Sequence, residues 1–108
     1  MVTNVRFVEL AETELDEATA YYDAEAVAGV AGAFANEIER VLGLAMQFPD
    51  SGTLVPQRRV RREIRLFRLN PDFPYDIVVT TIEEEDLLLV IAIAHHSRKP
   101  KYWASRIG

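Results

Sequence analysis

Two stretches in the first half of the chain carry apolar residues at the spacing of amphipathic helices. In the first stretch, Leu15, Ala18 and Tyr22 recur at i, i+3 and i+7, so they share one helical face. In the second, apolar residues repeat every three or four positions between residues 30 and 48, and Pro-Asp-Ser-Gly at 49–52 is a stop signal. Two such helices with a short connection predict an antiparallel helical hairpin.

A period of two replaces the helical period in the second half of the chain. Residues 60–69 predict a strand in which Ile64 and Leu66 lie on one face, and Arg65 and Phe67 lie on the other.

Four further segments complete the predicted elements. Residues 5–8 are short and rich in β-formers, and residues 75–82 predict another strand. Residues 87–94 are apolar on both faces, as in a central strand, and residues 102–107 can form one short helical turn. We therefore expect an α+β fold in the order β-α-α-β-β-β. The hairpin would cover one face of a small, mainly antiparallel sheet, and the other face would be open or partly covered by the C-terminal turn.

Composition limits the class of protein. With 108 residues, 49% of them apolar, the chain predicts a single domain over residues 1–108 with its own core. It has no cysteine, which excludes disulfides and thiolate metal sites and fits a reducing compartment. No stretch is apolar enough to span a membrane, and the N-terminal residues do not resemble a signal peptide. We expect a cytoplasmic protein that does not bind membranes.

The net charge of −5 is unevenly distributed. Residues 1–50 hold two basic residues against ten acidic ones, and residues 51–108 hold ten basic residues against seven acidic ones. Such asymmetry can create a local field for an anionic partner. The carboxylates of the first helix are interpreted as a solvated face.

Six arginines gather around the first predicted strand of the second half: Arg58, Arg59, Arg61, Arg62, Arg65 and Arg68. Arginine suits bidentate binding of phosphate or carboxylate, so contact with nucleic acid or with an acidic partner peptide is one interpretation. The other is an edge strand that its charges protect against aggregation.

Two adjacent histidines follow the last predicted strand. His95 and His96 would point to opposite faces, so they cannot easily bind one metal. Either one could act as a general acid or base, or be a hydrogen-bonded residue at a strand end. We see no metal-ligand spacing and no cofactor motif, and expect neither metal nor cofactor. Tyr21, Tyr22 and Phe34 are interpreted as core residues.

Basic and aromatic residues are interleaved near the end of the chain: Arg98, Lys99, Lys101, Tyr102, Trp103 and Arg106. This composition suits single-stranded nucleic acid, whose bases stack on aromatic rings, and it also suits a protein interface. Alternatively, Tyr102 and Trp103 close the open end of the core.

A series of short motifs, in their order and spacing, resembles the RelE/ParE superfamily of type II toxin–antitoxin toxins, and most closely its ParE branch. The motifs are Leu15-Asp16-Glu17-Ala18-x-x-Tyr21-Tyr22, Phe34-x-x-Glu37-Ile38, Phe48-Pro49, Arg65-x-Phe67, Phe73-Pro74-Tyr75, Val90-x-Ala92-Ile93-Ala94-His95 and Arg98-x-Pro100-x-Tyr102-Trp103. They cover nearly the whole chain.

The resemblance implies a small bacterial toxin of the plasmid-stabilisation type, held in a hetero-oligomer by a cognate antitoxin. The antitoxin would order on binding as it wraps the hairpin and a sheet edge. Its expected contacts are Tyr22, Val30, Phe34, Arg61 and Arg65. The expected target-facing residues are Arg98, Lys101, Tyr102 and Trp103.

Activity divides within the superfamily. ParE-like members inhibit DNA gyrase and are not enzymes, whereas RelE-like members are ribosome-dependent mRNA endoribonucleases. In the second case the catalytic set in this chain would be Arg65, His95, His96, Arg98 and Tyr102. The acidic balance of the chain and its long hairpin favour ParE. Three departures from the family pattern leave a third alternative, an inactive relative that retains only antitoxin binding. They are Val79 where a tyrosine is common, a longer turn at 70–72, and the acidic excess.

Overall fold

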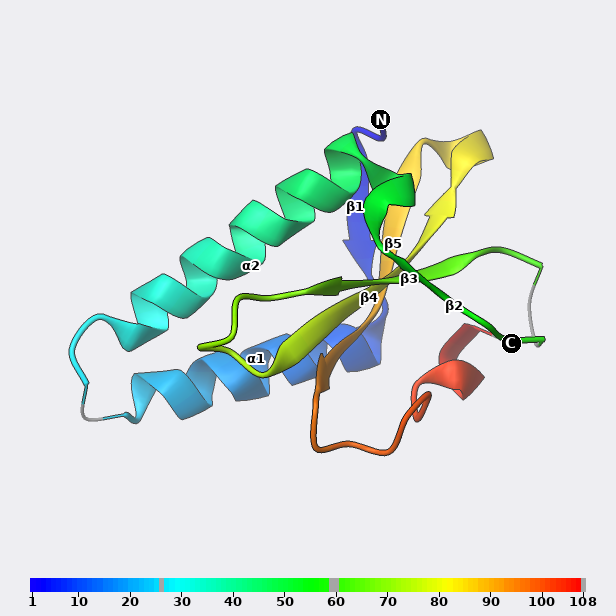
Figure 1. The fold of residues 1–108 in the computed structure, drawn as a ribbon. Coiled ribbons are helices and arrows are strands. Elements are labelled where there is room, and N and C mark those ends of the chain that lie inside the picture. Colours follow the sequence, from blue (N-terminus) through cyan, green and yellow to red (C-terminus); the bar gives the residue numbers. More distant parts are fainter. Residues whose placement is uncertain (26, 59–60, 108) are drawn as a thin grey trace.

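The computed structural model describes residues 1–25, 27–58 and 61–107, and it contains the predicted helical hairpin (Figure 1). Helix α1 spans Glu9–Asp23 and helix α2 spans Val30–Gln47. Gly29 precedes α2 with φ of 84°, a left-handed conformation that glycine adopts without steric cost. A single 3-10 turn at Pro49–Ser51 follows α2, at the predicted stop signal.

A five-stranded sheet in the order β1-β5-β4-β3-β2 supports the hairpin. Its strands are β1 (Asn4–Phe7), β2 (Thr53–Val55), β3 (Ile64–Arg68), β4 (Tyr75–Ile82) and β5 (Leu87–His95). Strand β1 pairs parallel with β5, and all other neighbours pair antiparallel. The α+β fold and the antiparallel pairing of the last three predicted strands are confirmed. The apolar β5 is central, as expected, because it lies between β1 and β4.

Strand β2 was not predicted, and it changes the interpretation of the arginine-rich segment. Three residues are too few to reveal an alternating pattern, so only the fold identifies this strand. Because β2 takes the edge, β3 is an interior strand, and the interpretation of the arginines as edge protection is wrong. Strand β3 begins only at Ile64, so Arg61 and Arg62 precede it, and the predicted alternation does not extend to them. Arg59 and Val60 lie outside the described residues.

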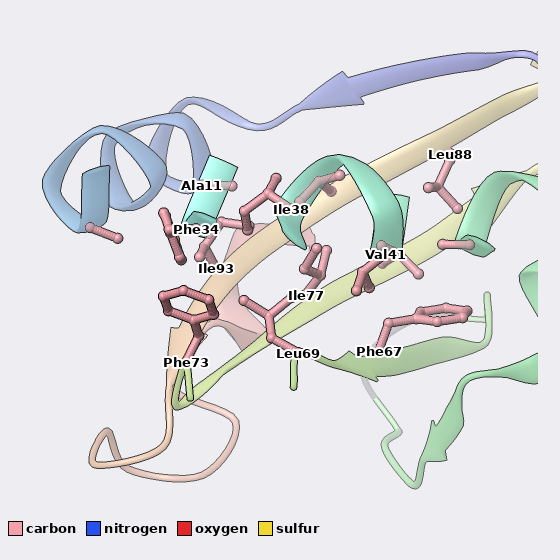
Figure 2. Close-up of a cluster of buried hydrophobic side chains, with 14 of the residues drawn as sticks. Ala11, Phe34, Ile38, Val41, Phe67, Leu69, Phe73, Ile77, Leu88 and Ile93 are labelled. Carbon is pink, nitrogen blue, oxygen red and sulfur yellow. The ribbon is translucent and has the colours of Figure 1, made fainter. Parts of the chain in front are cut away.

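The main core lies between the hairpin and one face of the sheet (Figure 2). Phe34 is fully buried, with its ring centroid 4.8 Å from that of Tyr22 and 5.3 Å from that of Phe73. The two helices cover Ile77 and Ile93, which are side chains of the sheet. Tyr21, by contrast, is 60% exposed, so its assignment to the core is wrong, whereas those of Tyr22 and Phe34 are confirmed.

A second, smaller core lies on the opposite face of the sheet. There Trp103, only 4% exposed, packs in one cluster with Val55, Ile64, Val78 and Ile91. A short 3-10 turn at Ala104–Ile107 completes this C-terminal cover. The expectation of a face partly covered by the C-terminal turn is therefore confirmed.

Candidate functional site

The C-terminal segment, residues 96–107, is fastened to the sheet by a carboxylate of α1. Glu14 follows Ala11 by three residues and precedes Ala18 by four, so it lies on the buried stripe of the helix. Its Oε1 accepts a hydrogen bond of 3.1 Å from the backbone N–H of Ile93. This N–H belongs to β5 beyond Val90, where the pairing with β1 ends. Glu14 thus takes the place of a missing strand neighbour.

The same carboxylate binds three side chains of the C-terminal segment. Arg106 donates from Nη1 to Oε1 at 2.8 Å and from Nη2 to Oε2 at 3.0 Å, and the Tyr102 hydroxyl donates to Oε2 at 2.6 Å. The guanidinium of Arg98 lies 3.9 Å from the centroid of the Tyr102 ring, and its Nη1 lies 3.9 Å from Oε2 of Glu14. We call Glu14, Arg98, Tyr102 and Arg106 the Glu14 cluster.

Electrostatics in the Glu14 cluster keep the carboxyl ionised and the phenol neutral. Burial works to raise the pKa of Glu14, but the hydrogen bonds from Arg106, Tyr102 and the Ile93 N–H outweigh it, so the pKa is lowered. Burial and the bond to Glu14 raise the pKa of Tyr102 well above its ordinary value. Tyr102 is therefore a poor base at neutral pH. The interpretation of the α1 carboxylates as a solvated face is wrong for Glu14.

A second polar group lies at the ends of β3, β4 and β5. Oδ1 of Asp76 lies 3.2 Å from Nε of Arg68 and 3.0 Å from Nε2 of His96. His95 turns elsewhere: its Nδ1 lies 2.8 Å from the Ser97 hydroxyl, and its ring meets Tyr75 edge-on. The two histidines thus have separate partners.

An open pocket of about 320 Å³ lies between these two groups. Its floor is formed by apolar side chains that include Leu66, Ala94 and Trp103. Its basic rim consists of Arg68, His96, Arg98, Lys99 and Lys101. Lys101 has a left-handed φ of 59°, and its Nζ donates to the carbonyl oxygen of Pro56 at 2.6 Å.

Arg65 lies on the other side of the sheet. It is paired with Val79, which belongs to the hairpin-side core, and its Nη1 donates to the carbonyl oxygen of Gly52 at 2.8 Å. Arg98 and Tyr102 pack on the opposite face, where Tyr102 contacts the second core. The sheet therefore separates Arg65 from Arg98 and Tyr102 of the predicted ribonuclease set.

The residues predicted for the antitoxin differ in exposure. Tyr22 and Phe34 are buried in the main core, Val30 is partly buried, and Arg61 is exposed. The hairpin instead presents other apolar side chains to solvent, among them Tyr21 at 60% exposure and Val27 at 70%. Sequence reasoning missed Glu14 and Asp76, although Glu14 carries a signal, since it is a carboxylate on an apolar helical stripe.

Comparison with known proteins gives a family. Within the described residues, no helix is long and apolar enough to cross a membrane, and no group of three or more His, Cys, Asp or Glu could hold a metal ion. Searches of curated proteins and of solved structures gave no significant match. The family model for the ParE toxin of the type II toxin–antitoxin system, parDE, matches residues 5–100. The chain therefore belongs to the ParE toxin family of type II toxin–antitoxin systems.

Proposed function

We propose that this protein is a cytoplasmic toxin that inhibits DNA gyrase by binding rather than by catalysis, and that a cognate antitoxin neutralises it. Residues 1–108 act as one toxin domain in this proposal. The family match supports the toxin role. The observation that favours gyrase over the ribosome is the distribution of the polar groups over two faces of the sheet.

A ribonuclease needs a base beside the ribose 2′-hydroxyl and cations on the phosphate within one site. Arg65 lies across the sheet from Arg98, and the hydroxyl of Tyr102 is bound by Glu14 at 2.6 Å. His95 and His96 have different partners. This arrangement favours a binding surface built on the C-terminal segment over an acid–base site.

The hairpin is the proposed antitoxin-facing surface. Tyr21, Val27 and Leu44 are exposed apolar residues on or beside its helices. An antitoxin segment that orders on binding would gain the burial of this apolar surface, which offsets its loss of conformational entropy. Arg65 donates to the carbonyl oxygen of Gly52 just before the edge strand β2, where a wrapping segment would end. Arg61 precedes β3 and is exposed, so it is available to the same segment.

The test is pulse labelling of DNA and protein synthesis in bacteria just after this chain is induced without its antitoxin. We expect DNA synthesis to fall first, with DNA-damage signalling. Arg98→Ala and Lys99→Ala should weaken the effect, and Arg65→Ala should leave it unchanged if the protein folds equally well. An early fall in protein synthesis that Arg65→Ala and His95→Ala abolish would instead establish the ribonuclease. No effect on either synthesis would favour the inactive relative.

A further inference from the structure

The charged residues at the end of the chain are all basic. Residues 87–108 contain Arg98, Lys99, Lys101 and Arg106 and no acidic residue. The exposed acids of the helical hairpin include five on α1, the helix whose Glu14 holds the C-terminal segment. They are Glu9, Glu12, Asp16, Glu17 and Asp23. A polyanion would therefore be attracted to the C-terminal segment and repelled by the exposed face of α1.

The cations on the C-terminal side are spread over two open pockets, one on each flank of the C-terminal segment. The pocket of about 320 Å³ has Arg68 and Lys99 on its rim, and a second of about 590 Å³ is lined by Arg61 and Arg106. Each pocket also has one carboxylate, Asp76 or Glu84, that is paired with an arginine. The side chains of Lys99 and Arg61 are exposed and form no ion pair with any described residue. Arg68 remains 73% exposed although it pairs with Asp76. These side chains are available to a ligand.

The aromatic rings of this face are not available for stacking with bases. Trp103 is 4% exposed and forms part of the second core. One side of the Tyr102 ring is covered by Arg98, whose guanidinium lies 3.9 Å from the ring centroid. Single-stranded nucleic acid is normally bound by exposed aromatic rings. The available groups are therefore suited to phosphates and not to bases.

We propose that the C-terminal face, on both flanks of residues 96–107, binds the phosphodiester backbone of duplex DNA. Arg61, Arg68 and Lys99 provide the principal contacts. Cations spaced along a face match the regular charges of a duplex, whereas an acidic peptide would need cations that converge on a few carboxylates. This inference goes beyond the proposed function, because it requires contact with DNA whether or not gyrase is the target.

The test is the fluorescence anisotropy of a short labelled DNA duplex titrated with the purified full chain over a series of salt concentrations. We compare Lys99→Gln and Arg61→Gln with Arg6→Gln, which removes the same charge from an exposed residue on β1, at the opposite edge of the sheet. Each lost phosphate contact should reduce the magnitude of the slope of log affinity against log salt by about 0.9. At about 0.1 M salt, this change corresponds to a roughly eightfold loss of affinity for the duplex. Arg6→Gln should change neither the slope nor the affinity. All three variants should have the melting temperature of the parent chain.

Three results would overturn the inference. They are no salt-dependent binding by the parent chain, equal losses in Arg6→Gln and Lys99→Gln, or tighter binding of a single strand than of the duplex. Tighter binding of poly-glutamate than of the duplex at equal charge concentration would be a fourth such result, because it would assign the face to an acidic protein. Gyrase inhibition by the same variants is measured separately. DNA binding without inhibition would refute only the proposed function, and inhibition without DNA binding would refute only this inference.

Discussion

Replacement of Glu14 tests whether one carboxylate holds the C-terminal segment on the sheet. Glu14→Ala would leave the guanidinium of Arg106, whose side chain is 11% exposed, without its carboxylate, and the hydroxyl of Tyr102 without its acceptor. Removing one partner of a buried ion pair costs about 3–5 kcal/mol. Glu14→Gln keeps the shape and one acceptor oxygen, so we expect a loss of about 2–3 kcal/mol. For a domain of this size, that lowers the melting temperature by about 10 to 20 °C.

Urea denaturation followed by circular dichroism and by Trp103 fluorescence measures this loss. Trp103 is the one tryptophan of the sequence, and it belongs to the segment that Glu14 holds and is buried against the sheet, so its emission reports the local release of that segment. Glu17→Gln, an exposed position on the same helix, is the matched control and should change stability by less than about 0.5 kcal/mol. Equal losses in the two variants would refute the role assigned to Glu14.

The pH dependence gives an independent check on the same residue. Because the folded pKa of Glu14 is lowered below the ordinary 4.5, its contribution is fully present above about pH 4.5 and is lost as pH falls through the folded pKa. Glu14→Gln should therefore have a shallower decline in stability below pH 4.5 than the parent chain. An unchanged decline would show that other carboxyls account for the acid sensitivity.

Four further variants test packing and a second buried carboxylate. A Cβ at Gly52 would lie 2.5 Å from Cε1 of Phe67, so Gly52→Ala should cost about 1–3 kcal/mol in a urea titration. Gly43→Ala in α2, where a Cβ meets open space, should instead stabilise by about 0.5–1 kcal/mol; a loss at Gly43 would contradict this. Trp103→Ala should cost about 3–5 kcal/mol and loosen the C-terminal segment in hydrogen exchange, and unchanged protection there would contradict its burial. Hydrogen bonds lower the pKa of Glu37, so Glu37→Gln should reduce the fall in stability below pH 4.5. The same fall in the variant as in the parent chain would argue against this role of Glu37.

The hairpin and the central strand were predictable because each carries a long, periodic signal. The stripe of α2 and the doubly apolar β5 run for 18 and 9 residues, long enough for periodicity to identify them. Strand β2 has three residues, and only its pairing with β3 makes it a strand. The sequence could place the arginines near a strand, but it could not show that another strand, β2, would pair with the free edge of that strand.

The site was less predictable, because side chains distant in sequence meet only in the folded chain. Glu14 and Arg106 are separated by 92 positions, and no local pattern couples them. The motif spacing could not show that Arg65 and Arg98 lie on opposite faces, since this depends on the path of the chain after β5. A carboxylate on an apolar stripe, as at Glu14 and Glu37, is the sequence signal that indicates such a buried partner.

The most direct test of the proposed function is a supercoiling and DNA-cleavage assay with purified gyrase and the purified chain. We expect loss of supercoiling and accumulation of cleaved DNA, both reversed by the cognate antitoxin, with no cleavage of messenger RNA on ribosomes. Normal gyrase activity at a large excess of folded chain, together with cleavage of ribosome-bound message, would contradict the proposal.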